Sequence, residues 1–242
     1  GASVNEDSLY GFYYDDNPFH TQNRLIMALT GTNEQCFVPL DVFKTETAGT
    51  SEYNFISNGM PVYAFFSCND SFGSLEVNGR RLGDLFTNES DCIHYIGSFE
   101  VGEDVNVYVN RGNVSENFYY LDMGAFERAV NTLKAKELEV EHYNNRKVSG
   151  SVTAREGDVL FTSIPYDEGW SVRVNGKKVE LKKFADSLIA VPLNAGENRV
   201  EMTYTAKGFT IGVWISLAAL IILLIPLIGK IGSNVKEKSS MK

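Results

Sequence analysis

Residues 73–82 read GSLEVNGRRL, and residues 169–179 read GWSVRVNGKKV. The box valine-asparagine-glycine-basic-basic-aliphatic therefore occurs twice, 97 positions apart. In each copy an Asn-Gly pair follows a run in which apolar and polar residues alternate. A two-residue hairpin turn of type I′ needs positive φ at both central residues, and asparagine and glycine tolerate this best. Both copies are predicted to form β-hairpins.

Further strand signals follow each hairpin. A glycine-acid turn at Gly102 precedes the alternating run 105–109, and another at Gly196 precedes the run 200–204. Short strands of period two, separated by turn residues, are typical of antiparallel sandwiches. The predicted fold class is therefore mainly β: two tandem antiparallel β-sandwich (jelly-roll-like) domains with short helices.

Two helices are expected beside the sheets. The first begins at Asn17 and Pro18, because asparagine caps helices and proline fits the first helical position, and it ends before Gly31. The second starts at Asp122, and its apolar residues recur at helical spacing as far as Leu133. This second helix is predicted to connect the two domains.

The chain is predicted to divide into four segments. They are a first β domain at 1–121, a second at 122–208, an apolar helix at 209–228 and a basic tail at 229–242. The first ten residues are mostly polar and are expected to be loose. The opening Gly-Ala-Ser without methionine suggests a piece of a longer protein.

The segment from Phe209 to Ile228 reads FTIGVWISLAALIILLIPLI, 20 residues without a charge. At about 1.5 Å per residue, such a helix crosses a hydrocarbon core of roughly 30 Å. Trp214 suits an aromatic anchor at the headgroups. The tail has four lysines and one glutamate, so the positive-inside rule places it in the cytoplasm. We expect one C-terminal transmembrane helix with residues 1–208 on the extracytoplasmic side.

The part expected outside is acidic. The tail holds four of the 22 Lys and Arg residues and one of the 31 Asp and Glu residues, which leaves 18 basic and 30 acidic side chains, a net charge of −12. Nucleic acids and anionic lipid surfaces attract basic proteins. Nucleic acid is therefore not an expected partner, and the overall charge argues against docking on anionic lipid.

Motifs for catalysis are absent from the sequence. The cysteines, Cys36, Cys68 and Cys92, and the three histidines have no metal-ligand spacing. No phosphate-binding loop, dinucleotide-binding motif or nucleophile elbow occurs. No catalytic residue, metal or cofactor is expected. A disulfide between Cys68 and Cys92 stays open, because both fall in the first predicted domain.

The turn before the second hairpin offers a candidate substrate-binding site. Tyr166, Asp167 and Trp170 place two aromatic rings near a carboxylate. Such a group binds sugars when a ring stacks on the sugar and the acid accepts hydroxyl hydrogen bonds. The alternative is a structural turn, in which Asp167 bonds nearby backbone and Trp170 fills the core.

A family resemblance rests on several motifs. The run IPYDEGWSVRVNGKKV at 164–179 continues through PLNAGEN at 192–198, Tyr204 and GFTIG at 208–212 into the apolar segment. Upstream stand Asn17-Pro18-Phe19, Gln22-Asn23 and Leu29-Thr30-Gly31. Together they resemble the C-terminal extracytoplasmic region and last transmembrane helix of the YfhO family of bacterial multi-pass membrane proteins. The resemblance is loose in the first half and specific from about residue 120 onward.

This resemblance implies a function that the residues alone do not show. Family members look like GT-C-type glycosyltransferases, which move a sugar from an undecaprenyl-phosphate carrier to cell-wall polymers such as teichoic acid. The catalytic acid of such enzymes lies in an early extracytoplasmic loop between N-terminal spans that are not in this sequence. The chain is therefore expected to be a non-catalytic, acceptor-binding part, partnered by the rest of the parent protein in the bacterial cell membrane.

A second class of function stays open. The chain would then be a membrane-anchored surface protein whose two sandwiches bind carbohydrate or protein, without an enzymatic parent. No LPxTG motif precedes the apolar segment, which argues against covalent wall anchoring. Two basic pairs, Arg80-Arg81 and Lys177-Lys178, follow the hairpin tips. They either meet an anionic polymer or serve solubility and edge protection.

Overall fold

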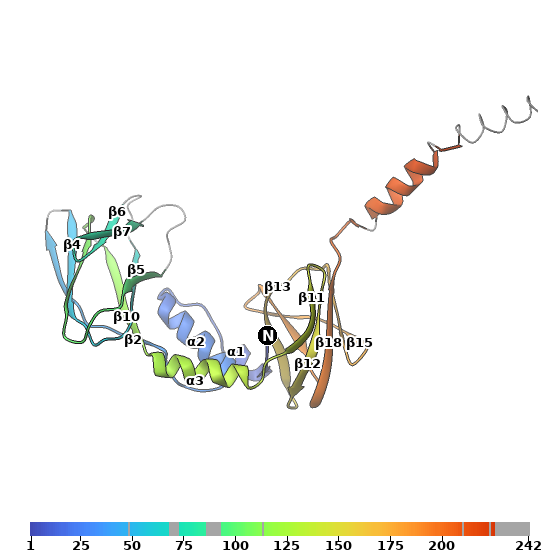
Figure 1. Ribbon diagram of the computed structural model, residues 1–242, viewed down its shortest axis with the longest axis horizontal. Helices are drawn as coiled ribbons and strands as arrows, with labels where there is room; N and C mark the ends of the chain where they lie inside the picture. The colour runs from blue at the N-terminus through green and yellow to red at the C-terminus, as the bar shows by residue number, and fades with distance from the viewer. Residues whose placement is uncertain are drawn as a thin grey trace, which may run out of the picture.

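The structure, a computed structural model, is mainly β, with four antiparallel sheets and few helices (Figure 1). It describes residues 1–47, 49–67, 73–85, 93–112, 114–209, 211–222 and 224–225. The sheets form two β units, and the two sheets of each unit share one apolar core. The mainly β class predicted from the hairpin repeat is thus confirmed.

The first β unit combines a four-stranded sheet, β2-β10-β5-β8, with a five-stranded sheet, β3-β4-β9-β6-β7. Alternate side chains of a strand face one side of its sheet, so Val105, Val107 and Val109 of β9 all enter the core. Tyr53 of the same sheet meets Phe118 of the other, with ring centroids 5.1 Å apart. The strands are β2 (Phe37–Pro39), β3 (Phe43–Thr47), β4 (Thr50–Ile56), β5 (Val62–Ser67), β6 (Gly73–Val77), β7 (Arg80–Leu85), β8 (His94–Gly97), β9 (Asp104–Val109) and β10 (Ser115–Leu121).

The second β unit has the same plan, with sheets β1-β13-β17-β16 and β11-β12-β18-β14-β15. Val172, Val200 and Met202 of one sheet pack against Leu160 and Ile189 of the other. The strands are β1 (Ala2–Asn5), β11 (Glu139–Asn144), β12 (Lys147–Ala154), β13 (Asp158–Pro165), β14 (Trp170–Val174), β15 (Lys177–Val179), β16 (Lys182–Phe184), β17 (Leu188–Pro192) and β18 (Gly196–Tyr204).

Both predicted hairpins are confirmed. At the β6–β7 turn, φ is 49° at Asn78 and 73° at Gly79, and at the β14–β15 turn it is 52° at Asn175 and 78° at Gly176. The residues that flank each Asn-Gly pair are directly opposite one another. Positive φ at both central residues is the type I′ geometry that the sequence predicts.

The two hairpin asparagines also make the same contact with a third strand. The side-chain oxygen of Asn78 accepts a hydrogen bond from the Asn106 N–H at 2.8 Å, and that of Asn175 accepts one from the Arg199 N–H at 2.8 Å. An aspartate in place of either asparagine could accept the same hydrogen bond, but it would add a negative charge at the hairpin tip of a protein that is already acidic. The internal repeat therefore extends from the sequence to individual hydrogen bonds.

The two predicted helices are also confirmed. Helix α2 (Pro18–Thr30) is capped by Asn17, whose side chain accepts from the Phe19 N–H, and it ends at Gly31 with φ of 72°. Helix α3 (Met123–Lys134) is capped by Asp122, whose side chain accepts from the Ala125 N–H. Cap residues satisfy N–H groups that have no partner within the helix.

These helices lie between the two β units (Figure 1). Ala28 of α2 packs with Val4 and Val159 against the second unit. Ala125 of α3, with Cys36, packs against the four-stranded sheet of the first unit, on Phe37 of β2, Leu121 of β10 and Tyr63 of β5. The helical layer therefore contacts a sheet of each unit and joins the two.

The prediction that the first ten residues are loose is wrong. They form β1 and the short helix α1 (Glu6–Tyr10), and β1 pairs with β13 from Ala2 opposite Phe161 to Asn5 opposite Asp158. Val4 is 1% exposed, so burial of an apolar side chain and backbone pairing together fix the segment. The predicted division after residue 121 had placed this segment with the first domain, whereas its strand lies in the second β unit.

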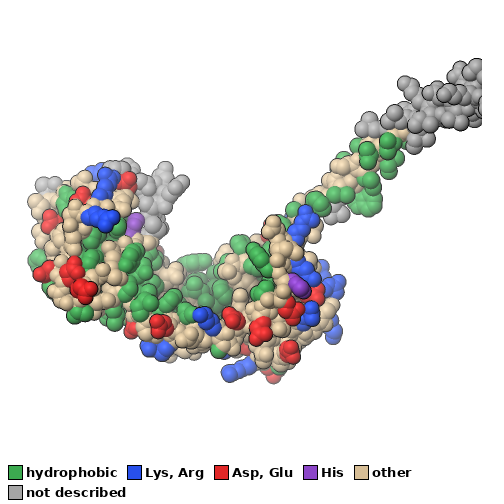
Figure 2. All heavy atoms as spheres, in the orientation of Figure 1, with side chains coloured by type: hydrophobic (Ala, Val, Ile, Leu, Met, Phe, Trp, Pro, Cys, Tyr) green, Lys and Arg blue, Asp and Glu red, His purple; other side chains and the backbone are tan. Residues whose placement is uncertain are grey.

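The predicted transmembrane segment is described at 209, 211–222 and 224–225. Residues 211–222 are helical, and their largely apolar side chains are exposed (Figure 2). Within the described part of the chain, no helix combines the length and the apolar content needed to cross a membrane. The predicted basic tail, 229–242, lies outside the described residues.

Candidate functional site

The predicted sugar-binding turn connects β13 with β14. Tyr166 follows β13, and its N–H donates to the carbonyl of Ser187 at 2.7 Å. Its half-buried ring packs on the core of the second β unit, and Lys183 Nζ lies 4.3 Å from the ring centre. A cation at this distance is attracted to the ring face. The Tyr166 ring is therefore partly occupied by contacts of the fold itself.

Asp167 holds the turn together. Its Oδ1 accepts a hydrogen bond from the Gly169 N–H at 2.7 Å, and its carbonyl accepts one from the Trp170 N–H at 3.1 Å. Short polar side chains that bond backbone two residues ahead stabilise turns in this way. The side chain is exposed, and none of the described residues donates a hydrogen bond to its other oxygen. One oxygen thus serves the turn, and the other faces solvent.

Trp170 is the first residue of β14 and stands opposite Tyr204 of β18. The two rings are 5.1 Å apart between centroids, at 53°, and Trp170 also packs against the core. Among ring pairs of the described residues, Tyr166 and Trp170 make no contact with each other. The structure thus places the three predicted residues on one turn but gives the two rings separate partners.

Glycine is required at position 169 because neighbouring atoms approach the backbone too closely to leave room for a side chain. A Cβ at this position would lie 2.5 Å from the Thr205 carbonyl oxygen and 2.8 Å from both Asp167 Oδ1 and Tyr204 Cε2. The Gly169 carbonyl in turn accepts from the Thr205 N–H at 2.9 Å. The turn is therefore packed directly onto the end of β18.

An exposed ion pair reinforces this contact. Lys207 Nζ donates to a carboxylate oxygen of Glu168, and this hydrogen bond lowers the pKa of Glu168 and raises the pKa of Lys207. Exposed pairs contribute little to stability. The pair nevertheless neutralises Lys207, the lysine that precedes the apolar segment.

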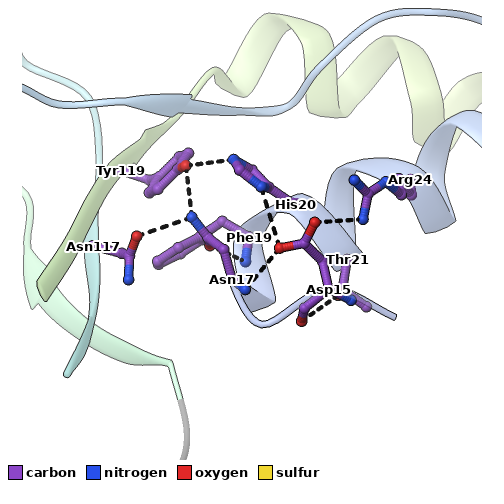
Figure 3. A network of polar contacts seen from close by, with 8 residues as sticks. All are labelled: Asp15, Asn17, Phe19, His20, Thr21, Arg24, Asn117 and Tyr119. Atoms are coloured by element: carbon purple, nitrogen blue, oxygen red, sulfur yellow. Dashed lines mark hydrogen bonds and ion pairs between the residues drawn. The ribbon is translucent and has the colours of Figure 1, made fainter. Parts of the chain in front are cut away.

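A second polar cluster, not anticipated from the sequence, surrounds the start of α2 (Figure 3). Asn17 Nδ2 lies 2.9 Å from both Asn117 Oδ1 and Tyr119 Oη, and donates to them. Tyr119 Oη is 3.0 Å from His20 Nε2, and His20 Nδ1 is 3.4 Å from Asp15 Oδ1. These contacts attach the loop before α2 to strand β10 of the first unit.

Asp15 organises the loop side of this cluster. Its carboxylate accepts from the Asn17 N–H at 2.9 Å and from Arg24 Nη1 at 2.8 Å. These two donors, the backbone N–H first, hold the pKa of Asp15 below its ordinary value. The carboxylate is therefore a fixed negative charge beside the half-exposed ring of His20.

Exposed tyrosines border the same loop. Tyr10, Tyr13 and Tyr14 are 74%, 58% and 68% exposed, and the Arg24 guanidinium lies 3.8 Å above the Tyr13 ring. Exposed rings next to carboxylates suit the apolar faces and hydroxyls of sugars. The signal in the sequence was the density of aromatic and acidic residues in YGFYYDDNP at 10–18.

The cysteines and the two basic pairs singled out in the sequence are placed as follows. Cys36 is a buried free cysteine, and burial raises the pKa of its thiol. Cys68 and Cys92 lie outside the described residues. Of the basic pairs, Arg81 bonds Asp84 on the same strand, and Lys177 and Lys178 are exposed on β15. The described residues contain no group of three side chains able to hold a metal ion.

Comparison with known proteins gives a family match. The family described as bacterial membrane protein YfhO matches residues 57–216. A protein of Bacillus subtilis (strain 168) titled "Uncharacterized protein YfhO" is 27% identical over 96 residues, which are 40% of this chain and 11% of that protein. The chain therefore corresponds to a small part of this relative's length.

Solved structures show only weak likeness. A β-glucuronidase from Ruminococcus gnavus in complex with D-glucuronic acid has a TM-score of 0.23 and 11% identity, covering 66% of this chain and 34% of that one. A conserved protein of unknown function from Pseudomonas aeruginosa PAO1 has a TM-score of 0.20 and 11% identity, covering 64% and 75%. Scores this low do not establish a shared fold.

Proposed function

Because the chain belongs to the YfhO family of bacterial membrane proteins, we propose that it is the extracytoplasmic, membrane-proximal end of such a protein. In this proposal residues 209–228 cross the cell membrane, residues 1–208 lie outside, and the lysine-rich tail lies in the cytoplasm. The observation that carries the proposal is the family match itself, which runs from the first β unit into the apolar segment.

The parent protein in this proposal is a GT-C-type glycosyltransferase. It moves a sugar from an undecaprenyl-phosphate carrier to a wall polymer such as teichoic acid, as the family resemblance implies. The two β units, which match the predicted domains at 1–121 and 122–208 except that β1 belongs to the second unit, are jelly-roll-like sandwiches that take no part in the chemistry. Their task is to hold the acceptor polymer near the membrane, where the lipid-linked donor is found.

Two surfaces suit the acceptor. The first is the turn with Tyr166, Asp167 and Trp170, where the solvent-facing oxygen of Asp167 can accept a hydroxyl hydrogen bond. The second is the tyrosine loop, defined by Tyr10, Tyr13 and Tyr14, whose rings offer more exposed area than the two half-buried rings of the turn. Both surfaces bring apolar rings and carboxylates together, as sugar recognition requires.

A binding experiment tests the acceptor role. The full chain, reconstituted in nanodiscs, would be titrated with purified wall teichoic acid. Asp167→Asn keeps the oxygen that accepts from Gly169 but removes the charge, and Tyr14→Ala removes an exposed ring. Each should weaken binding by roughly fivefold, the effect of about 1 kcal/mol. Glu180→Gln and Tyr143→Ala, at exposed positions elsewhere, are the matched controls.

The transferase parent is tested separately in cells. Wall polymer from cells whose parent protein carries Tyr14→Ala and Asp167→Asn should hold less of the added sugar than wild type. Unchanged wall sugar together with weakened polymer binding would support the other class of function, a membrane-anchored binding protein. Unchanged binding in both variants would contradict the acceptor role altogether.

A further inference from the structure

A pocket lies at the end of the second β unit where the chain leaves β18 for the apolar segment. It has a volume of about 460 Å³ and is lined by residues that include Asn145, Arg146, Tyr204, Thr205 and Phe209. Figure 2 shows basic side chains at this point of the surface, next to the hydrophobic side chains of the projecting helix. The pocket therefore joins a polar wall to the first residue of the predicted span.

Arg146 is held in this pocket by its backbone. The turn between β11 and β12 is closed by Asn144, whose Oδ1 accepts from the N–H groups of Arg146 and Lys147 at 2.9 and 2.8 Å. The Arg146 carbonyl accepts from the Tyr204 N–H at 2.8 Å. The guanidinium lies 5.5 Å from the Phe209 ring centre. The backbone of Arg146 is thus fixed by hydrogen bonds, and its guanidinium lies beside the first residue of the apolar segment.

Among the residues that the structure describes, the charge of Arg146 is not neutralised by an acidic side chain. Its two neighbouring cations have carboxylate partners: Lys147 lies 3.8 Å from Glu201, and Lys207 bonds Glu168. In the part of the chain that the structure describes, no carboxylate pairs with Arg146. In an acidic protein, an unpaired guanidinium at this position points to an external anion.

We propose that Arg146 binds the phosphate of a membrane lipid headgroup and so fixes how the second β unit stands on the membrane. The inference rests on the proposed insertion of residues 209–228, which brings Phe209 to the depth of the headgroups. A guanidinium binds phosphate through two parallel hydrogen bonds, and an aromatic ring with an adjacent polar wall suits the headgroup region.

The negative net charge of residues 1–208 does not oppose a contact between Arg146 and a lipid phosphate. Charges further away than about 8 Å are largely screened at physiological salt, whereas the proposed bond is direct. Zwitterionic phospholipids carry the same phosphate as anionic ones. The site therefore recognises the phosphate group rather than a negatively charged surface.

Native mass spectrometry of the full chain, released from a maltoside detergent, tests the proposal. The lipids to add are phosphatidylcholine, phosphatidylglycerol and, as a lipid without phosphate, diacylglycerol. We expect both phospholipids to remain bound and diacylglycerol to dissociate. Arg146→Gln should weaken phospholipid binding about tenfold. Arg146→Lys should weaken it less, because lysine keeps the positive charge but lacks the two parallel N–H donors of the guanidinium. Arg173→Gln, an exposed arginine on β14, is the matched control and should bind as wild type.

Two results would overturn the inference. One is phospholipid retention by Arg146→Gln equal to that of wild type. The other is full displacement of the lipid by inorganic phosphate at the same concentration, which would make the pocket a site for free phosphate. Vesicle flotation keeps the two proposals apart: a chain that does not float with vesicles refutes membrane insertion. A chain that floats while Arg146→Gln retains lipid refutes only the phosphate site.

Discussion

Trp170 and Tyr204 stand opposite each other on neighbouring strands, and their ring centroids are 5.1 Å apart. Tyr204 is the last residue of β18, the strand that leads to the apolar segment. The pair therefore couples the predicted sugar-binding turn to the end of the sheet from which that segment leaves. Variants in this turn have to be measured for folding as well as for binding.

Trp170→Ala should destabilise the second β unit by about 2–3 kcal/mol, because removal of the large, half-buried ring leaves a cavity beside Tyr204. Urea unfolding followed by circular dichroism, and faster amide exchange in β14 and β18, would measure the loss. Trp214→Ala is the control, since that ring is 66% exposed on the apolar helix. Equal stability of the two variants would show that Trp170 is not a packing residue.

Gly169→Ala and Gly176→Ala form a matched pair of glycine substitutions. A Cβ at Gly169 meets the Thr205 carbonyl oxygen, whereas a Cβ at Gly176 has nothing within 4 Å and only the strain of a φ of 78°. Gly176→Ala should cost about 1 kcal/mol, and Gly169→Ala at least twice as much, because backbone has to move. Thermal unfolding of both variants checks the order, and the reverse order would contradict it.

Asn17→Ala should destabilise the contact between α2 and the first β unit by about 2 kcal/mol. It removes the helix cap and both hydrogen bonds to Asn117 and Tyr119. Asn17→Asp separates the two roles, because its carboxylate still accepts from the Phe19 N–H but cannot donate. Amide exchange in α2 and β10 would show protection lost at both elements for alanine. For aspartate, we expect the larger loss at β10.

The stability contributed by Asp15 should depend on pH. Its folded pKa is depressed by the Asn17 N–H and the Arg24 guanidinium, so the contribution is present above the unfolded pKa of about 4. It is lost as the pH falls from there through the lower folded pKa. Asp15→Asn should therefore show a smaller drop in urea midpoint between pH 6 and pH 3 than wild type. Asp16→Asn, an exposed neighbour, is expected to keep the wild-type drop.

The sequence predicted the local elements well because their signals are local. Two Asn-Gly pairs fixed two hairpins, and Asn17 with Pro18 and Asp122 fixed two helix starts. Each signal depends on the backbone preference of one or two residues, which the rest of the fold does not override here. The family resemblance read from residues 164–179 was likewise confirmed by the match over 57–216.

The tertiary structure alone decided which distant residues meet. No local pattern in Ala2–Asn5 indicates that it pairs with β13, more than 150 residues later, because strand pairing depends on the partner's free edge and on shared burial. The same holds for Asn17 with Asn117 and Tyr119, and for Arg146 with Phe209. The sequence by itself determined the class, the turns, the helices and the family. Long-range packing decided where the N-terminal strand lies and which polar groups converge, since these energies arise only when separate segments are brought together.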